Sequence, residues 1–565
     1  MVAKNNKNTW IIAIVVIIGA VFLLSTFGGI TGKQINTKTN MPNNLVDREL
    51  FKEEPIIISS KGVPPSVGYE REEVPVGGPT HLWDAFSYKG ISSSTFTQPK
   101  VFDLDLDGRN EIISTLSGVD VDRDCRFLNG LYVWDENGNL KPNFPVELNI
   151  GQCGAVSIVG VGDVVGDNKL EIVIAIGNSG NGGGIYVVLN NGQILSEIES
   201  DSAFSGGDSM HAVLNDLDND GKLEILASSF EELNSKLYIW RGDGSYFPGW
   251  PVDPPSDRLG EPLVVDLRSN GIKNILVANH PTDPFQEEGH AIIAYNLDGT
   301  INWLFDIDQI GHNFLFTSNK LFAADINGGE DEEEVDGSKE IVLHTADNYI
   351  LILNKDGNKI GEWYSTVGDP YPHMKDITIG DLNKDGQMEI IYHDEKKIFV
   401  TNSSGKAWQG FPLYIFEEDP NKYYPLTNLG IADLDGDGFP DIYGQALNKY
   451  GDRGDRQGEH MYAIFAFDRF GNALDGFPFQ RLKYEDFPDG TFWTYVEKYQ
   501  PTFADINKDG IADMVTSKGW GRIEAFTLNS RYNKNVAYFP QYGVDEKNTK
   551  FVPTRRFPTP IPPSP

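Results

Sequence analysis

Short apolar runs recur along the chain, and each of them either follows an acidic stretch or leads into a glycine turn. Five runs of the first kind are residue pairs typical of β-strands, namely Ile112-Ile113, Ile225-Leu226, Ile390-Ile391, Ile442-Tyr443 and Met514-Val515. Runs of the second kind are aromatic or aliphatic and meet turns at Gly138, Gly192, Gly244, Gly299, Gly357, Gly405 and Gly471. No helical period appears outside the N-terminus. The pattern predicts a repeated unit of strand A, acidic loop, strand B, longer connection, strand C, glycine turn and strand D.

The acidic stretch is a nonapeptide that occurs eight times. Its first residues are Asp103, Asp163, Asp216, Asp266, Asp325, Asp381, Asp433 and Asp505. The mean period is (505 − 103)/7, or about 57 residues, which accommodates four strands with generous loops. Four-stranded sheets with hydrophobic faces must stack, and closing them into a ring leaves only short edges exposed. We therefore predict an all-β fold, a β-propeller of about eight four-stranded blades with seven as the alternative; a β-solenoid usually has shorter rungs.

Five of the nonapeptides present oxygen ligands at positions 1, 3, 5 and 9 from side chains and at position 7 from the backbone carbonyl. Calcium prefers six to eight oxygen ligands, and a curled loop with this spacing can supply them. A glycine at position 6 permits the tight turn. The sequence thus predicts several Ca²⁺ ions, bound by Asp103, Asp105, Asp107, Arg109 and Glu111; Asp216, Asp218, Asp220, Lys222 and Glu224; Asp381, Asn383, Asp385, Gln387 and Glu389; Asp433, Asp435, Asp437, Phe439 and Asp441; and Asp505, Asn507, Asp509, Ile511 and Asp513.

An EF-hand is the obvious competitor for such a loop, but it needs a bidentate Glu at position 12 and flanking helices. Position 12 of the five loops is Ser114, Ala227, Tyr392, Gly444 or Thr516. The residues after position 9 are the β-type pairs given above. The loop is therefore expected to join two strands.

Three nonapeptides are damaged in ways that have chemical consequences. Val165 stands at the third position of the copy at Asp163, which removes one ligand and weakens binding. The copy at Asp266 contains Arg268, whose guanidinium is expected to replace the metal charge. The copy at Asp325 is interrupted by an acidic insertion that is expected to be a solvated loop, with an extra metal site as the alternative.

At this point the repeats resemble a known family, the FG-GAP or VCBS repeats, which form calcium-bearing propellers such as the head of integrin α subunits. The resemblance covers roughly residues 95 to 545 and includes Gly-Phe-Pro or Gly-Trp-Pro triplets at Gly249, Gly410 and Gly476. The segment from Phe539 to Lys550 is similar to one that often closes such propellers. The resemblance implies the fold and the calcium, but it implies no single activity.

The N-terminal region predicts export. Trp10 to Phe27 is an apolar run without a charge, long enough to cross a bilayer, and the preceding Lys4 and Lys7 favour a cytoplasmic N-terminus. We predict a membrane anchor or signal segment in residues 1–31, a stalk or linker in 32–80, a propeller in 81–550 and a proline-rich tail in 551–565. The propeller is then expected on the outside of the cell membrane, held by a single span, or secreted if the segment is cleaved.

The net charge limits the kinds of partner that the protein can bind, and the cysteines bear on its cellular compartment. The formal net charge of −35 argues against nucleic acid as a partner. The two cysteines, Cys125 and Cys153, are placed by the strand pattern on one face of adjacent blades, where a disulfide is feasible in an oxidising compartment. Two free thiols are the alternative.

The face opposite the calcium loops is expected to carry the ligand site, because the longer connections meet there. These connections combine aromatic and polar residues, an arrangement that suits sugars, and include Trp83, Phe86, Tyr423, Tyr424 and Trp493. At least half of these rings are expected to pack between blades instead. No catalytic or cofactor-binding motif is present. We therefore expect a recognition module for carbohydrate or protein rather than an enzyme. The alternative is a polysaccharide lyase, which some calcium propellers resemble, with His211, His312 or His373 at the site.

Overall fold

A computed structural model describes residues 79–86, 94–118, 130–148, 155–177, 184–199, 212–228, 235–255, 258–280, 290–311, 321–326, 337–345, 348–365, 377–394, 397–415, 423–425, 429–448, 462–481, 500–518 and 521–533. All of them lie in one compact unit, Pro55–Pro565. No helix within these ranges is long and apolar enough to span a membrane. The predicted span Trp10 to Phe27, both cysteines and the tail lie outside the described residues.

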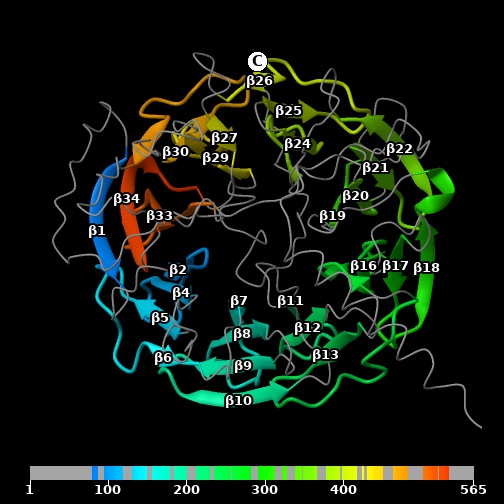
Figure 1. Cartoon of the computed structure of the whole chain (residues 1–565), viewed down its shortest axis with the longest axis horizontal. Coiled ribbons are helices and arrows are strands. Elements are labelled where there is room, and N and C mark those ends of the chain that lie inside the picture. The colour runs from blue at the N-terminus through cyan, green and yellow to red at the C-terminus, as the bar shows by residue number, and fades with distance from the viewer. Residues whose placement is uncertain are drawn as a thin grey trace, which may run out of the picture. The chain divides into compact units, whose positions relative to one another are not determined.

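The described strands form eight separate antiparallel sheets that follow one another around a ring (Figure 1). Blade 1 contains β2 (Ser94–Phe96), β3 (Lys100–Phe102), β4 (Glu111–Gly118), β5 (Gly130–Trp134) and β6 (Val146–Glu147). Blade 2 contains β7 (Ala155–Gly162), β8 (Glu171–Gly177), β9 (Gly184–Leu189) and β10 (Ile194–Glu199). Blade 3 contains β11 (Ala212–Asn215), β12 (Glu224–Ser228) and β13 (Leu237–Trp240), with bridges to Tyr246 and Val252 at its outer edge. Blade 4 contains β14 (Arg258–Leu259), β15 (Leu263–Val265), β16 (Asn274–His280), β17 (Ala291–Tyr295) and β18 (Ile301–Asp306).

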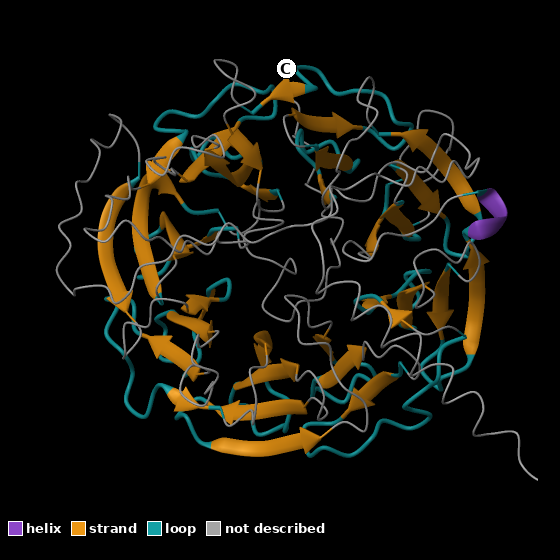
Figure 2. Cartoon of the chain, in the orientation of Figure 1, coloured by secondary structure: helices purple, strands orange, loops and turns teal. Residues whose placement is uncertain are grey.

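The second half of the ring repeats the arrangement. Blade 5 contains β19 (Leu321–Ala324), β20 (Glu340–His344), β21 (Tyr349–Leu353) and β22 (Lys359–Tyr364), and blade 6 contains β23 (Thr378–Gly380), β24 (Glu389–His393), β25 (Lys397–Thr401) and β26 (Leu413–Tyr414). Blade 7 contains β27 (Tyr423–Pro425), β28 (Gly430–Ala432), β29 (Asp441–Asn448), β30 (Tyr462–Phe467) and β31 (Phe479–Arg481). Blade 8 contains β32 (Thr502–Ala504), β33 (Ile511–Lys518), β34 (Arg522–Arg531) and, from the other end of the chain, β1 (Thr80–Phe86). The described ranges hold one short 3-10 helix, η3 (Asp308–Ile310), and are otherwise strands and loops (Figure 2).

The prediction of an all-β propeller is confirmed, with eight blades rather than seven. Each blade runs through strands A, B, C and D from the centre of the ring outwards, as the apolar runs predict. The acidic nonapeptides join strand A to strand B in every blade, so the exclusion of an EF-hand is also confirmed.

The eighth blade lacks an outer strand of its own, and β1 supplies it. β1 pairs antiparallel with β34, from Thr80 opposite Thr527 to Phe86 opposite Arg522. Asp84 in β1 accepts hydrogen bonds from His81 (2.6 Å) and from Arg522 (2.7 Å). Strand β3 of blade 1 contacts β32 of blade 8. The ring is thus closed by the two ends of the propeller chain, while the segment Phe539 to Lys550, which sequence resemblance suggested for closure, lies outside the described residues.

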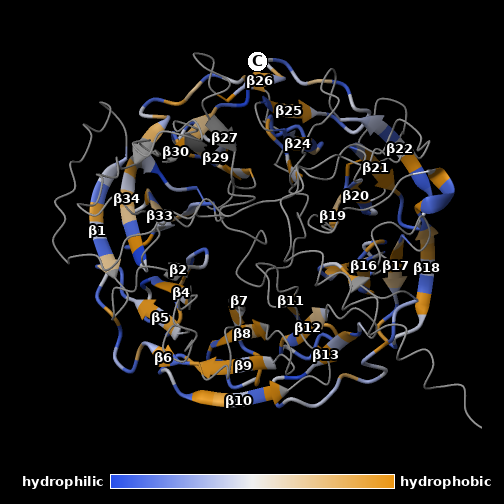
Figure 3. Ribbon diagram, in the orientation of Figure 1, coloured by the Kyte–Doolittle hydropathy of each residue, from blue (hydrophilic) through white to orange (hydrophobic). Residues whose placement is uncertain are grey.

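The hydrophobic core lies between neighbouring blades. Because successive strand residues face opposite sides, each central strand packs against two neighbours. Ile172 and Ile174 of β8 face blade 1, whereas Val173 and Ala175 face blade 3. The central strands are therefore hydrophobic on both faces, as Figure 3 shows for β8 and β9. Each fully buried Ile or Val contributes about 1.5–3 kcal/mol.

Tryptophans join the outer rim of one blade to the glycine turn of the next. The indole N–H of Trp83 donates to the carbonyl of Glu136 (2.9 Å), and a Cβ at Gly138 would overlap the Trp83 ring. The same contact links Trp250 to Leu297, Trp303 to Lys355 and Trp408 to Arg469 at 2.8 to 3.1 Å. Each acceptor lies two residues before the turn glycine, so the contact is a repeated part of the fold.

Two aromatic pairs predicted on the ligand face belong to strands. Trp83 and Phe86 lie in β1, and the Trp83 ring packs against a glycine turn on the side of the acidic loops. Their assignment to a long connection was wrong, because closure of blade 8 pairs residues that are far apart in sequence. Tyr423 and Tyr424 lie in β27, which pairs with β29.

Candidate metal centre

The acidic loops share one hydrogen bond that fixes their shape. In seven of these loops the acid at position 9, or at the corresponding place in the interrupted loop, lies at or near the start of strand B, and its carboxylate turns back to accept the backbone N–H of position 2. This bond joins Leu104 to Glu111, Val164 to Glu171, Leu217 to Glu224, Ile326 to Glu340, Leu382 to Glu389, Leu434 to Asp441 and Ile506 to Asp513, at 2.7 to 3.1 Å. The acid at position 9 therefore has a structural role in addition to any role as a ligand.

The first aspartate closes the other side of the loop. Asp216 accepts the backbone N–H of Asp220 and of Gly221, both at 3.1 Å. Asp381 accepts the corresponding amides of Asp385 (3.1 Å) and Gly386 (2.9 Å). These bonds orient the carboxylates toward the inside of the loop, where positions 3 and 9 also point.

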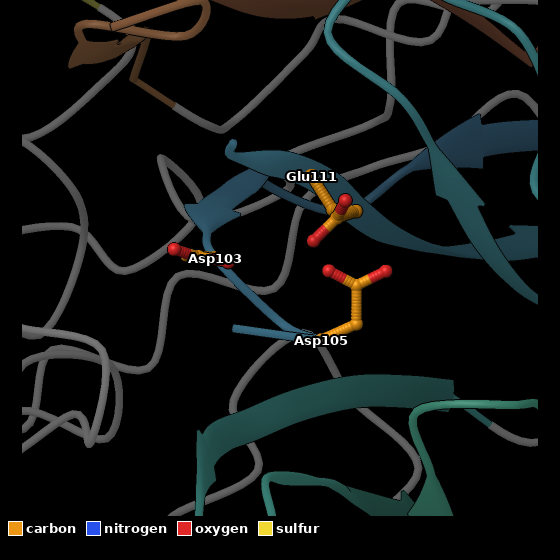
Figure 4. Close-up of side chains that lie close together, drawn as sticks. All are labelled: Asp103, Asp105 and Glu111. Carbon is orange, nitrogen blue, oxygen red and sulfur yellow. The ribbon is translucent and has the colours of Figure 1, made fainter. Parts of the chain in front are cut away.

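Three loops bring their carboxylates together within reach of one ion. In each of them, one oxygen from position 1, position 3 and position 9 lies within 4.8 Å of the other two. The groups are Asp103, Asp105 and Glu111; Asp216, Asp218 and Glu224; and Asp433, Asp435 and Asp441. Figure 4 shows the carboxylates of Asp105 and Glu111 facing each other. In the loops at Asp381 and Asp505 position 3 is an asparagine, whose amide oxygen is also a ligand for calcium.

Burial of the acid at position 9 raises its pKa. Burial raises the pKa of Glu224 and of Asp513 to about 7, and that of Glu389 and of Asp441 to about 8, against the pull of the position 2 amide. The neighbouring aspartates add to this rise through charge repulsion. The pKa of Asp381 and of Asp433 is raised as well, again mainly by burial. The loops hold negative charge at a cost that a bound cation would offset.

Cationic side chains approach the carboxylates of some loops. The Lys141 ammonium lies 2.6 Å from Asp105 and 2.8 Å from Glu111, and the Lys508 ammonium lies 2.8 Å from Asp103. Single guanidinium groups lie at 3.3 Å from Asp218 and at 3.4 Å from Asp437, contributed by Arg241 and Arg469. Arg241, Lys141 and Arg469 come from glycine turns or the residues just after them. The acidic loops and the glycine turns thus share one face of the ring, as the strand order predicts.

The damaged loops differ in what replaces the missing ligand. Val165 leaves Glu171 buried with its Oε1 atom unpaired, and burial raises the pKa of Glu171 to about 7. Arg268 ion-pairs with Asp356 in the glycine turn of blade 5 at 2.5 Å. The expectation that Arg268 replaces the metal charge inside its own loop is therefore wrong, since its long side chain reaches a neighbouring blade. The acidic insertion after Asp325 lies outside the described residues.

One loop holds a buried oxygen that a cation would satisfy. The Oδ1 atom of Asp505 is buried without a hydrogen-bond partner, and the charge of Asp505 acts on the nearby carboxyl group of Asp513 in the same loop. A buried carboxylate oxygen without a partner costs about 1–3 kcal/mol. A hard cation satisfies such oxygens, so the residues fit calcium, and the predicted ligands stay a prediction for all five loops.

Sequence reasoning missed Lys141 and Lys508 as neighbours of the loops. Lys508 is position 4 of its own nonapeptide, and it pairs with the loop of the next blade in the ring. No local pattern indicates such a contact. A local pattern could have pointed to Lys141, which stands three residues after the turn glycine Gly138. The same position in other blades is uncharged, namely Leu195, Phe247, Trp408 and Leu474.

Eight four-stranded blades with an acidic loop between strands A and B define an eight-bladed β-propeller. Within it, residues 163–227 match the model of the FG-GAP-like repeat. The match runs from the acidic loop of blade 2 to strand B of blade 3, so the predicted repeat is confirmed there.

Solved structures give further likenesses at low identity. The chain is similar to the rhamnogalacturonan lyase YesW (14% identity, 80% of this chain and 94% of that one, TM-score 0.45). It is also similar to a Bacillus licheniformis rhamnogalacturonan lyase (14% identity, 85% of this chain and 96% of that one, TM-score 0.43). A third similar structure is the V. cholerae biofilm matrix protein Bap1 (12% identity, 85% of this chain and 96% of that one, TM-score 0.38). At such low sequence identity these likenesses describe the fold alone and not the function. No curated protein matches the chain.

Proposed function

We propose that this protein is a calcium-stiffened β-propeller, anchored at the outer side of the cell membrane, that binds a carbohydrate or protein ligand. The observation that carries the proposal is the buried acid at position 9 of the loops. Burial raises the pKa of Glu389 and Asp441 to about 8, and Asp505 holds an unpaired oxygen in the same kind of loop. A bound Ca²⁺ would neutralise these charges, and millimolar calcium is available outside cells.

The residues that would hold the cation are those at positions 1, 3, 5 and 9, with the carbonyl of position 7. Their strands are already fixed by the propeller, so the ion would tie the end of strand A to the start of strand B. Position 4 of several loops has a left-handed backbone, with φ of 61° at Leu106 and 57° at Lys508. Such backbone costs about 1 kcal/mol or more for a residue with a Cβ. We infer that calcium stiffens this face.

The opposite face is the proposed ligand surface, since the connections from strand B to C and from D to A start there. β29 ends at Asn448 and β30 begins at Tyr462, and β31 ends at Arg481 before β32 begins at Thr502. These intervals hold many of the chain's aromatic and polar residues. A rigid ring that displays variable connections on one face is a common basis for recognition.

Glycan arrays and pull-down of surface proteins with the full chain test the recognition function. We expect Trp493→Ala and Tyr424→Ala to weaken ligand binding at least about tenfold, as loss of an aromatic anchor often does. Phe470→Ala is the matched control, because Phe470 is 46% exposed in a glycine turn on the calcium face. Equal loss in all three variants contradicts the proposed surface. Cleavage of a uronate polymer by the wild-type chain, abolished in His373→Ala, would replace the recognition function with a lyase.

A further inference from the structure

All three carboxylates of the Asp103 loop that converge on one point are held by lysines. Lys141 bridges Asp105 and Glu111, and Lys508 reaches Asp103 from blade 8. Glu111 is only 2% exposed, so Lys141 reaches the innermost oxygen of the loop. Two ammonium groups thus occupy the oxygens that would surround a calcium ion.

The backbone that places Lys141 is common to several blades. The N–H of Lys141 donates to the strand C carbonyl of Val133 at 2.9 Å. Phe247, Trp408 and Leu474 make the same bond in blades 3, 6 and 7, at 2.8 to 3.0 Å. These positions are structurally equivalent, and only that of blade 1 carries a cation. The lysine is therefore a local feature of blade 1 and not of the repeat.

The loop of blade 6 gives the opposite case. Asp381 and Glu389 accept backbone amides there, and no lysine or arginine of the described residues lies within ion-pair distance of Asp381, Asp385 or Glu389. Lys384, the residue equivalent to Lys508, extends toward the next loop, that of blade 7, where its ammonium lies 5.0 Å from the centre of the Phe439 ring. Two loops whose ligand patterns differ only in Asp105 against Asn383 at position 3, among their side-chain ligands, therefore have different charged neighbours.

We propose that Lys141 and Lys508 are built-in counter-ions that take the place of calcium in the Asp103 loop. This loop then binds calcium at least about tenfold more weakly than the loop at Asp381, because the ion must displace two ammonium groups or bind beside them against Coulomb repulsion. The inference rests on the proposed calcium function of the other loops. It adds that the cation preference of a loop is determined by the residue three positions after the turn glycine and by position 4 of the preceding loop.

The location of the Asp103 loop explains why lysines in place of calcium would be useful there. It lies at the seam between blade 8 and blade 1, whose inner strands come from opposite ends of the propeller chain. Lys508 to Asp103, Asn110 to the Asp505 carbonyl (2.7 Å) and Thr502 to the Pro99 carbonyl (2.6 Å) join the two blades. With lysines in the loop, the seam closes whether or not calcium is bound.

Counting tightly bound calcium ions tests the inference directly. In the full chain, titrated against a calcium chelator, Asp385→Asn should remove one tight site, whereas Asp105→Asn should leave the number of tight sites unchanged. Loss of a tight site in both variants would overturn the inference. A wild-type chain that binds no calcium would instead refute the proposed calcium function.

Removing the lysine tests the counter-ion role without relying on the other loops. Lys141→Met should lower the melting temperature in EDTA, and calcium should restore it by filling the Asp103 loop at least about tenfold more tightly than in wild type. Lys406→Met is the matched control, since Lys406 is an exposed residue next to a turn glycine in blade 6. Lys508→Met, at a side chain 41% exposed, provides a second variant that should fold if Lys141→Met does not. Melting and calcium affinity equal to wild type in both variants would overturn the inference.

Discussion

The loops at Asp103 and Asp381 have nearly the same ligand pattern but different surroundings. In the first, ammonium groups hold Asp103, Asp105 and Glu111. Backbone amides bind the acids at positions 1 and 9 in both loops, but in the second no lysine or arginine of the described residues pairs with Asp381 or Glu389, and burial raises the pKa of both carboxyl groups. The nonapeptide therefore determines where oxygens converge, while residues of the glycine turn and of the neighbouring blade determine which cation they meet.

Removing calcium should have the largest effect. Each loop of the second kind gains about 2.7 kcal/mol at a calcium concentration one hundred times its Kd. We expect EDTA to lower the free energy of unfolding by roughly 10 kcal/mol if the loops at Asp216, Asp381, Asp433 and Asp505 are all filled. Calorimetry with and without EDTA measures this. An unchanged melting temperature would contradict calcium binding by these loops.

The pH dependence in EDTA should be the next largest effect. A carboxyl group whose pKa is raised by folding binds a proton more tightly in the folded state than in the unfolded chain. Its stabilising contribution is complete below the unfolded pKa, 4.5 for Glu389 and 3.8 for Asp441, and is lost as pH rises through the folded value, about 8 for both.

We therefore expect the free energy of unfolding in EDTA to fall between pH 5 and pH 8, by at least about 1 kcal/mol for each such carboxyl group, and the melting temperature to fall with it. Saturating calcium should remove the fall, because the ion favours the charged form. Thermal melts in parallel pH series provide the measurement. A profile that rises over this interval in EDTA would contradict the uncompensated burial of these acids.

Substitution of the first aspartate should separate the two loops. In calcium, Asp381→Ala should cost about 3 kcal/mol, since it removes an ion and two hydrogen bonds from a buried site. Asp103→Ala should cost less, about 1–2 kcal/mol, because it breaks one partly exposed ion pair and the hydrogen bond from the Gly108 amide but removes no ion. Chemical denaturation of both variants gives the comparison, and equal costs would show that the two loops hold the same ion.

The smallest effect should come from the Asp216 loop, which has one cationic side chain beside its carboxylates. Arg241 places one guanidinium 3.3 Å from Asp218, where blade 1 has two ammonium groups around its loop. Arg241→Gln should tighten calcium binding at Asp216 by about threefold, since a single partly exposed charge is largely screened by water. Titration at low salt detects such a change. Weaker binding in this variant would indicate that Arg241 orients a ligand instead of competing with the ion.

Local patterns predicted the repeated unit because each unit is short and its chemistry is contained in about ten residues. Asp216 to Glu224 and the following Ile225-Leu226 pair specify a loop and a strand without reference to the rest of the chain. Of the contacts that sequence reasoning missed, those of Lys141 join residues of one blade, whereas the others join residues at opposite ends of the propeller chain. Asp84 meets Arg522 across 438 positions, and Lys508 meets Asp103 across 405. The pairing of β1 with β34 has no local signal, since Thr80 to Phe86 reads as one more polar and aromatic segment.

The position of β1 also bears on the order of events during synthesis. β1 leaves the ribosome first, and its partner β34 follows more than four hundred residues later. Blades 1 to 7 can each form from contiguous chain, whereas blade 8 must wait for the whole propeller sequence. Pairings of such long range are slow to form, and until then β1 has an unpaired edge that can join other strands. Release of a nearly complete chain, rather than folding of the first blades, should therefore limit the rate at which the closed ring appears.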